Sequence, residues 1–201
     1  TDLEAHIRDT IEAGCGLSDP KIVEMVVKEA ADRIDDLISS GVQFESDGTG
    51  FDLAIEGGHS SRRILHAKDA TGAEIERALI IEARASPNLE LLESHMAVDL
   101  ILKEKNAEIK GIAGIWVLTP NGEVRTIPTQ AVIIATGGAG HIYRQTTNPP
   151  VATGDGIAMA HRAGAIVRDL EFVQFHPTAL ALSGERPFLI SEALRGHGAV
   201  L

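Results

Sequence analysis

The chain has 201 residues and a formal charge of −11, from 18 Lys and Arg against 29 Asp and Glu, and 44% of its residues are hydrophobic. This composition excludes a disordered chain, the acidity argues against a nucleic-acid surface, and no apolar run approaches the roughly 18 residues of a membrane span. The single cysteine, Cys15, excludes a disulfide framework and a zinc-ribbon site and favours a cytoplasmic protein. The ends, at Thr1 and Leu201, indicate a piece of a longer protein.

Helix signals dominate the first 85 residues. We expect a helix over residues 3–13, and a second that starts at Asp19 and Pro20 and stops at Gly41. Asp19 can cap free N–H groups, and Pro20 suits a first turn where its missing N–H is not needed. A third amphipathic helix is expected over residues 72–84, after a glycine-rich loop.

Strand signals follow in the second half of the chain. We expect strands over residues 89–92, 97–102, 111–118, 123–127 and 131–135. Asn121-Gly122, between the third and fourth of these, predicts a hairpin turn. The continuous apolar run 131–135 is typical of a strand buried on both faces of a parallel sheet. With a further helix expected over residues 155–164, the pattern predicts the α/β class.

Two glycine-rich segments are candidate ligand sites. Residues 135–140 follow the apolar run, and glycines there let backbone approach a ligand at the end of a strand. Residues 153–156 place glycines and Asp155 at an expected helix N-terminus, where free N–H groups suit a phosphate or a ring carbonyl. The alternatives are a tight turn without a ligand and an Asp155 that only caps its helix.

A third candidate site combines an amide, an imidazole, hydroxyls, a carboxylate and a guanidinium. Together these groups can hold a small dicarboxylate, because Arg pairs with carboxylates and the others form hydrogen bonds. The alternatives are a core histidine and an ordinary i,i+3 ion pair between Glu192 and Arg195. The residues concerned are Gln174, His176, Thr178, Ser191, Glu192 and Arg195.

A fourth candidate is the loop Glu56-Gly57-Gly58-His59-Ser60. A carboxylate beside two glycines can meet a cationic group of a substrate, and the alternative is a solvated polar loop. His59 and His66 do not predict a metal site, because they lie seven residues apart without a third ligand at a usual spacing.

These motifs, in this order, resemble the flavoprotein family of succinate dehydrogenase, fumarate reductase and L-aspartate oxidase. The resemblance covers essentially the whole chain, and within the family it is closest to L-aspartate oxidases, because the dicarboxylate dehydrogenases tend to have an apolar residue in place of Glu56. The segments that carry it are Ala135-Thr136-Gly137-Gly138-Ala139-Gly140, Tyr143, Thr147-Asn148-Pro149, Thr153-Gly154-Asp155-Gly156, Gln174-Phe175-His176-Pro177-Thr178 and Glu192-Ala193-Leu194-Arg195-Gly196.

The resemblance implies a Rossmann-like fold and a flavin chemistry. Residues 1–170 would be the interior of an FAD-binding domain with a β-meander, and residues 171–201 the start of an α+β capping domain. FAD would be held non-covalently and would oxidise L-aspartate to iminoaspartate, with oxygen or fumarate as electron acceptor. Iminoaspartate would pass to quinolinate synthase on the route to NAD.

The resemblance also implies a role for each candidate residue. Glu56 would orient the substrate amine and, with His176 and Arg195, belong to the catalytic set. The implied substrate-binding residues are Gln174, His176, Thr178, Ser191 and Glu192, and the implied cofactor-binding residues are Ala135, Thr136, Gly137, Gly138, Gly154 and Asp155.

The chain also departs from the family pattern. It contains no G-x-G-x-x-G after a strand, so the turn that grips the FAD pyrophosphate is missing, and we expect the fragment to be inactive alone and not to retain FAD. The family's active-site arginine would lie beyond residue 201. His197 replaces a usually acidic residue, and Ser191 replaces a commoner Thr. The alternatives are a fumarate reductase or succinate dehydrogenase subunit and a non-catalytic α/β module.

Overall fold

The computed structural model describes residues 2–56, 58–68, 70–105, 108–176, 178–180 and 187–190. These residues fall into two compact units, one that runs to Leu91 and one from Leu92 to Ile190. The expected boundary between an FAD-binding domain and a cap at residue 170 stays a prediction.

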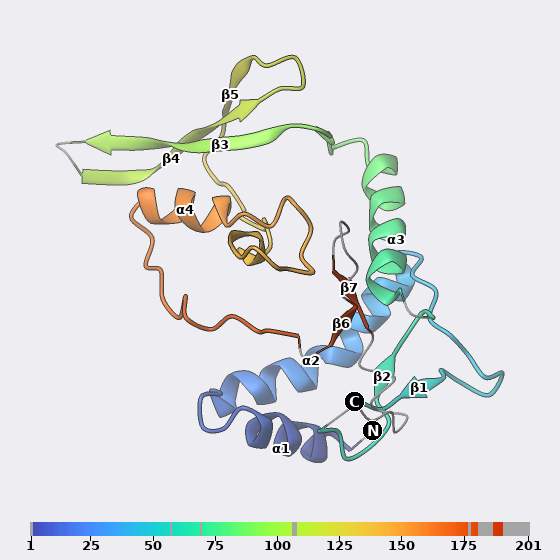
Figure 1. Cartoon of the computed structure of the whole chain (residues 1–201). Coiled ribbons are helices and arrows are strands. Elements are labelled where there is room, and N and C mark those ends of the chain that lie inside the picture. The colour runs from blue at the N-terminus through green and yellow to red at the C-terminus, as the bar shows by residue number, and fades with distance from the viewer. Residues whose placement is uncertain are drawn as a thin grey trace. The chain divides into compact units, whose positions relative to one another are not determined.

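Two helices open the first unit. They are α1 (Leu3–Ala13) and α2 (Pro20–Ser39), which contact each other (Figure 1). Asp2 accepts two backbone N–H groups of the first turn of α1, at 3.0 and 3.2 Å. Asp19 accepts one N–H at 2.9 Å at the start of α2, and Pro20 occupies its first turn. Both predicted helices are confirmed.

A small hairpin and a third helix complete the described part of the first unit. Strands β1 (Leu53–Ala54) and β2 (Ile64–Leu65) pair antiparallel, and the connection between them, residues 55–63, carries Glu56. Helix α3 (Thr71–Ala85) confirms the helix predicted over residues 72–84. The hairpin therefore presents Glu56 in a loop whose two ends are fixed by strand pairing.

The second unit contains the predicted β-meander. Strands β3 (Met96–Lys105), β4 (Glu108–Leu118) and β5 (Val124–Pro128) form an antiparallel sheet in the order β3-β4-β5. At the predicted turn between β4 and β5, Gly122 has a φ of 84° and donates its N–H to Thr119 O at 3.0 Å. Glycine suits this turn because it adopts positive φ without a steric penalty.

Helix α4 (Asp155–Arg162) lies alongside the meander (Figure 1). Its Arg162 pairs with Asp99 of β3, with 2.7 Å between Nε and Oδ2, and its Met159 is buried. The predicted helix over residues 155–164 is thereby confirmed. The remaining elements are η1 (Gly140–Ile142), β6 (Ala179–Leu180) and β7 (Phe188–Leu189).

Two predicted strands are wrong. Residues 89–92 and 131–135 have no strand structure, and all strand pairs in the described ranges are antiparallel. Residues 131–135 are not buried as predicted, and Ile133 is 92% exposed. A parallel strand forms only by hydrogen bonding to neighbours, and no described sheet contains a neighbour for this segment.

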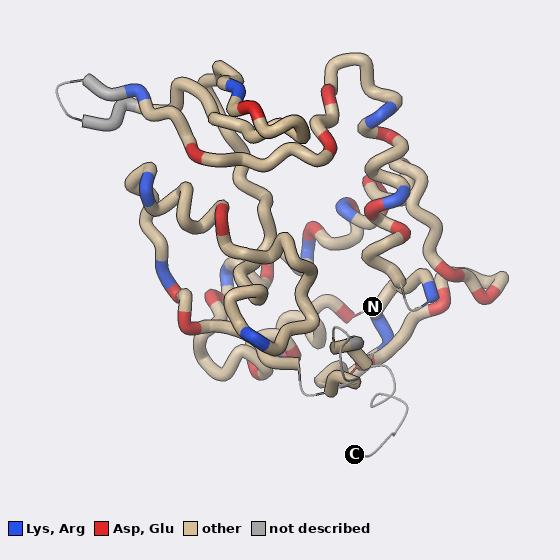
Figure 2. The backbone as a smooth tube through the Cα atoms, turned by 45° about the horizontal axis from the view of Figure 1, so that its top comes forward, with Lys and Arg blue, Asp and Glu red and all other residues tan. Residues whose placement is uncertain are grey.

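Charge is distributed over both units. Figure 2 shows Lys and Arg distributed among the more numerous Asp and Glu. In the described part of the chain, no helix combines the length and the apolarity that a membrane crossing needs.

Candidate functional site

The two glycine-rich segments predicted to meet a cofactor lie against each other in the second unit. His141 N–H donates to Ala152 O at 2.8 Å, which joins the end of one segment to the start of the other. A methyl group added at Gly156 would lie 2.0 Å from Thr136 Oγ1, and one at Gly154 would lie 2.9 Å from the Ala139 side chain. These glycines are therefore needed for close packing between the two segments.

Two other glycines of the first segment face open space. Gly137 has a φ of 69°, and no heavy atom lies within 4 Å of an added methyl group at Gly137 or Gly138. Gly137 lines a groove of about 440 Å³ together with Ala135, Thr136 and Gly156. Backbone at Gly137 and Gly138 is thus open to a ligand in the way that the sequence predicts.

Asp155 does not cap its helix. The cap residue of α4 is Gly154, with a φ of 79°, and no side chain bonds the first turn. Asp155 is exposed at the first helical position and accepts the hydroxyl of Thr153 at 2.8 Å. The interpretation of Asp155 as a simple cap is therefore wrong, and its carboxylate lies at the edge of the glycine segments.

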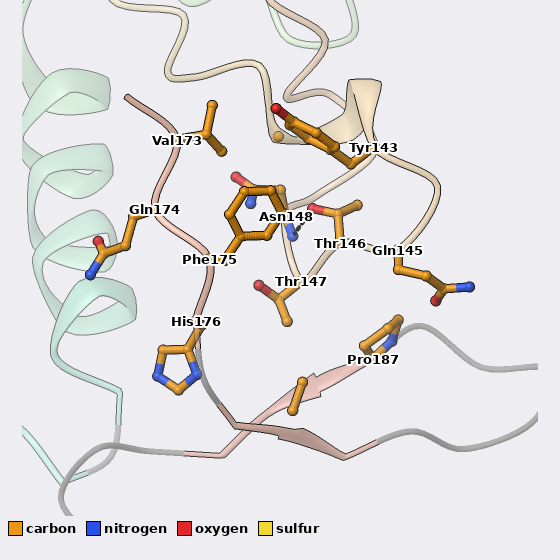
Figure 3. A pocket seen from close by; sticks show the side chains of 12 residues that line it. Tyr143, Gln145, Thr146, Thr147, Asn148, Val173, Gln174, Phe175, His176 and Pro187 are labelled. Atoms are coloured by element: carbon orange, nitrogen blue, oxygen red, sulfur yellow. Dashed lines mark hydrogen bonds between the residues drawn. The ribbon is translucent and has the colours of Figure 1, made fainter. Parts of the chain in front are cut away.

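A pocket of about 510 Å³ lies in the same unit (Figure 3). Gln174 and His176 belong to one wall, and a loop that contains Tyr143 and Asn148 forms another. The rings of Tyr143 and Phe175 meet edge to face with centroids 5.3 Å apart. In Figure 3, Phe175 points towards that loop, whereas Gln174 points to the opposite side of the extended segment. The volume suits a small-molecule ligand.

His176 and Thr178 place polar groups beside this pocket. His176 Nδ1 lies 2.8 Å from Thr178 O and 3.2 Å from Thr178 N, so the imidazole is held against the backbone of Thr178. The Oγ1 atom of Thr178 is buried and has no hydrogen-bond partner among the described residues. A buried hydroxyl without a partner is costly, so this atom points to a ligand group that supplies one.

The Glu56 loop belongs to the first unit. Glu56 is half-buried, and its carbonyl accepts the His59 N–H at 3.2 Å across a turn in which Gly58 has a φ of 86°. Further along the loop, Ser60 and Arg63 both contact the carboxylate of Asp9 on α1. The loop is thus ordered by contacts of its own chain and is not a freely solvated segment.

His66 pairs with carboxylates and not with His59. Its Nδ1 lies 3.0 Å from Glu45 Oε2 and its Nε2 lies 3.6 Å from Asp52 Oδ2. One ligand atom from each of the three residues falls within 4.8 Å of the other two. Because each carboxylate faces a different ring nitrogen, the geometry is that of an imidazole flanked by two carboxylates. The expectation that the protein binds no metal stays a prediction.

The structure unites part of the predicted site. Gln174 and His176 line the same pocket and Thr178 bonds to His176, and the two glycine segments that carry the cofactor residues pack against each other. Ser191, Glu192 and Arg195 lie outside the described residues. Sequence reasoning assigned no role to Tyr143, Asn148 or Phe175, although each stands inside a motif of the family resemblance and each lines the pocket.

The whole chain matches a protein-family model. Residues 1–201 match the family described as FAD binding domain, so the chain belongs to this family of flavoproteins. It is 47% identical to L-aspartate oxidase 2-b, chloroplastic, of Nicotiana tabacum over 99% of the chain and 32% of that protein. It is 46% identical to L-aspartate oxidase of a Nostoc species, over 98% and 33%. The chain therefore spans about a third of these curated relatives.

Solved structures agree with this assignment. A variant of E. coli quinol fumarate reductase superposes with a TM-score of 0.88 at 30% identity, over 98% of this chain and 33% of that chain. Mycobacterium smegmatis Sdh1 in complex with UQ1 gives 0.83 at 29% identity, over 98% and 34%. The predicted membership of the succinate dehydrogenase and fumarate reductase flavoproteins, and with it the predicted fold class, is confirmed.

The residues present fit FAD, the cofactor of the family. The open backbone at Gly137 and Gly138 leaves room that a side chain would fill, and the groove beside it is lined by the predicted residues Ala135 and Thr136. Asp155 stands at the positive end of a helix next to this groove. These are the residues of this chain that would hold the cofactor.

Proposed function

We propose that the protein to which this chain belongs oxidises L-aspartate to iminoaspartate with FAD. The observation that carries the proposal is His176 on the pocket wall, bonded to Thr178 with its unpartnered buried hydroxyl, in the same unit as the open glycine backbone. The 45–47% identity to proteins named L-aspartate oxidase supports the choice of substrate.

Each polar group of the site has a task in this reaction. The Thr178 hydroxyl donates to a substrate carboxylate, and His176, held by its bond to the chain at Thr178, presents its ring to the same group. Ser191 and Glu192 would add further hydrogen bonds, and Arg195 would pair with a carboxylate in a bidentate manner. Oxidation removes a hydride from Cα and a proton from nitrogen. When bound, FAD supplies the hydride acceptor.

Glu56 separates aspartate from other dicarboxylates. L-Aspartate carries an ammonium group that succinate and fumarate lack, and a carboxylate attracts it by Coulomb interaction. The same carboxylate gives succinate no favourable contact and repels its charge. Glu56 therefore favours L-aspartate by attracting its ammonium group and disfavours succinate by repelling its carboxylates.

A second candidate is a fumarate reductase or succinate dehydrogenase flavoprotein. The observation that favours it is the superposition on the E. coli quinol fumarate reductase, with a TM-score of 0.88. His176, Thr178 and the glycine segments serve either reaction, because both substrates are four-carbon dicarboxylates. Among the candidate site residues, Glu56 is the one that distinguishes the two substrates.

The remaining parts of the proposal concern acceptors, partners and location. Oxygen or fumarate takes the electrons, and quinolinate synthase uses iminoaspartate for NAD biosynthesis. We expect a cytoplasmic protein, and cell fractionation tests this. The isolated 201 residues are expected not to retain FAD, because no G-x-G-x-x-G turn is present. A stoichiometric amount of flavin on the purified chain would contradict that expectation.

The test of the proposal is a substrate comparison in a full-length protein that contains this chain. L-Aspartate and succinate are supplied side by side at equal concentration, and product formation is followed. Oxidation of L-aspartate in clear preference to succinate supports the oxidase. Preferential turnover of succinate, or reduction of fumarate without any use of aspartate, supports the second candidate.

A further inference from the structure

A single carboxylate on α1 holds the loop that carries Glu56. Asp9 Oδ2 accepts the backbone N–H of Ser60 at 3.0 Å and the hydroxyl of the same residue at 2.7 Å. The same oxygen also accepts from Arg63 Nη2. Three donors from a stretch of four residues therefore converge on one atom that lies more than 50 positions earlier in the chain.

Only three residues separate Glu56 from Ser60, which contacts Asp9. At the base of the loop, Arg63 N–H donates to Ala54 O at 3.0 Å and continues the β1–β2 pairing. Nearer to Glu56, the His59 N–H donates to Glu56 O at 3.2 Å. Glu56 is thus fixed on one side by the strands and on the other side by Ser60.

The ion pair between Asp9 and Arg63 is largely buried, which makes the loss of either partner costly. The Arg63 side chain is 4% exposed and that of Asp9 is 13% exposed. A buried guanidinium without a counter-charge is strongly unfavourable, so Asp9 and Arg63 depend on each other. The Ser60 N–H and hydroxyl, followed by the Arg63 guanidinium, hold the pKa of Asp9 well below its usual range, so the carboxylate stays charged at neutral pH.

The loop contains two further buried atoms that lack partners. His59 Nδ1 and Arg63 Nη1 make no hydrogen bond to any residue in the described ranges. These atoms would favour rearrangement of the loop towards water, because an unpaired buried polar atom is costly. The contacts to Asp9 hold Ser60 and Arg63 in this arrangement.

We propose that Asp9 is a positioning residue for substrate-amine recognition: it holds residues 58–63 in the geometry that places the Glu56 carboxylate against the ammonium group of L-aspartate. This inference rests on the proposed function, and it assigns to Asp9 no contact with substrate. Its effect is therefore specific to substrates that carry an ammonium group and requires the Glu56 carboxylate.

The test is a set of substitutions in the full-length flavoprotein. Asp9→Asn keeps the shape and one acceptor oxygen but removes the charge, and Ser60→Ala removes only the hydroxyl contact, for the case that Asp9→Asn does not fold. Glu12→Gln, an exposed carboxylate on the same helix, is the matched control. The KM and kcat are measured for L-aspartate oxidation and for fumarate reduction with an artificial electron donor.

The expected result is an increase in the KM for L-aspartate of about tenfold in Asp9→Asn and a smaller increase in Ser60→Ala, since displaced binding groups lose affinity steeply. The KM for fumarate in both variants should stay within about twofold of the wild-type value. The KM and kcat of Glu12→Gln should do the same for both substrates, because neither binding contact is lost. In a Glu56→Gln background, Asp9→Asn should add nothing, because Asp9 acts through the Glu56 carboxylate.

Two results would overturn the proposal. Equal changes in KM for L-aspartate and fumarate would show a general structural role, and additive losses in the double variant would show that Asp9 acts independently of Glu56. Failure of the wild-type protein to oxidise L-aspartate would instead reject the proposed function itself. The wild-type measurement thus separates the two failures.

Discussion

Asp99 on β3 and Arg162 on α4 form an ion pair across 63 positions of sequence, with 2.7 Å between Oδ2 and Nε. The pair fixes the end of α4 to the meander, and the opposite end of the same helix carries Asp155 and the second glycine segment. The Arg162 side chain, followed by the Leu100 N–H, lowers the pKa of Asp99. The meander thereby supports the candidate cofactor site.

The first prediction concerns this ion pair. Asp99 is 29% exposed and Arg162 is 52% exposed, so Asp99→Asn should lower the free energy of unfolding by only about 0.5 kcal/mol. The loss should shrink at high salt, where the charges are screened. Urea unfolding at low and high salt measures both effects. Glu123→Gln, whose carboxylate lies 3.7 Å from Arg125 on an exposed surface, is the control and should not change stability.

The second prediction concerns pH and Glu74. The Arg77 side chain, then the Gln43 N–H, lowers the pKa of Glu74 from 4.5 to about 2. A depressed carboxyl pKa stabilises the fold above pH 4.5, and this contribution is lost as the pH falls towards 2. Glu74→Gln should therefore be less stable than wild type at neutral pH, and the two should converge near pH 2.

Thermal unfolding between pH 2 and pH 7 measures this convergence. Glu76→Gln, an exposed carboxylate on the same helix, should follow the wild-type curve throughout. A constant gap between wild type and Glu74→Gln over the whole range would contradict the pKa shift.

The third prediction distinguishes a glycine needed for packing, Gly156, from a glycine that leaves room for the cofactor, Gly138. Gly156→Ala places a methyl group 2.0 Å from Thr136 Oγ1 and 2.7 Å from Ile134 Cγ2, so it should destabilise the protein by about 1–3 kcal/mol. Gly138→Ala meets no atom within 4 Å and should leave stability unchanged. In the full-length protein, Gly138→Ala should nevertheless reduce FAD retention, because the methyl group would fill the space left for the cofactor.

Flavin absorbance and denaturant unfolding of the two variants are the measurements. If Gly138→Ala retained FAD as tightly as wild type, the open backbone at residues 137–138 would not be the cofactor contact.

The fourth prediction concerns Glu56. In the full-length protein, Glu56→Gln should lower kcat/KM for L-aspartate by about tenfold or more, because a charged hydrogen-bond partner of the ammonium is lost. Turnover of succinate or fumarate should change much less, since neither has an ammonium group. Steady-state kinetics with each substrate test this. Equal losses for all substrates would remove Glu56 from amine recognition.

The helices and the meander could be predicted because their signals are local. Asp19 and Pro20 mark the start of α2, and Gly122 marks the hairpin, without reference to the rest of the chain. The segment 131–135 could not be judged in this way. Its apolar run favours a strand, but a strand needs hydrogen-bonding neighbours that the described residues do not provide.

The candidate site was predicted residue by residue but not as an arrangement. The sequence indicates that Gly154 and Gly156 belong to a ligand-binding segment, but not that they pack against Ala139 and Thr136. Asp9 could be given no role from the sequence, because its partners lie more than 50 residues away in the chain. Such contacts depend on tertiary packing, which local sequence patterns do not encode.

The central claim is that this chain belongs to an enzyme that oxidises L-aspartate in preference to other dicarboxylates. The most direct measurement is the ratio of kcat/KM for L-aspartate to that for succinate in the full-length flavoprotein. The account predicts a ratio well above one, with iminoaspartate as the product. A ratio below one, with succinate oxidised and L-aspartate left unchanged, would contradict it.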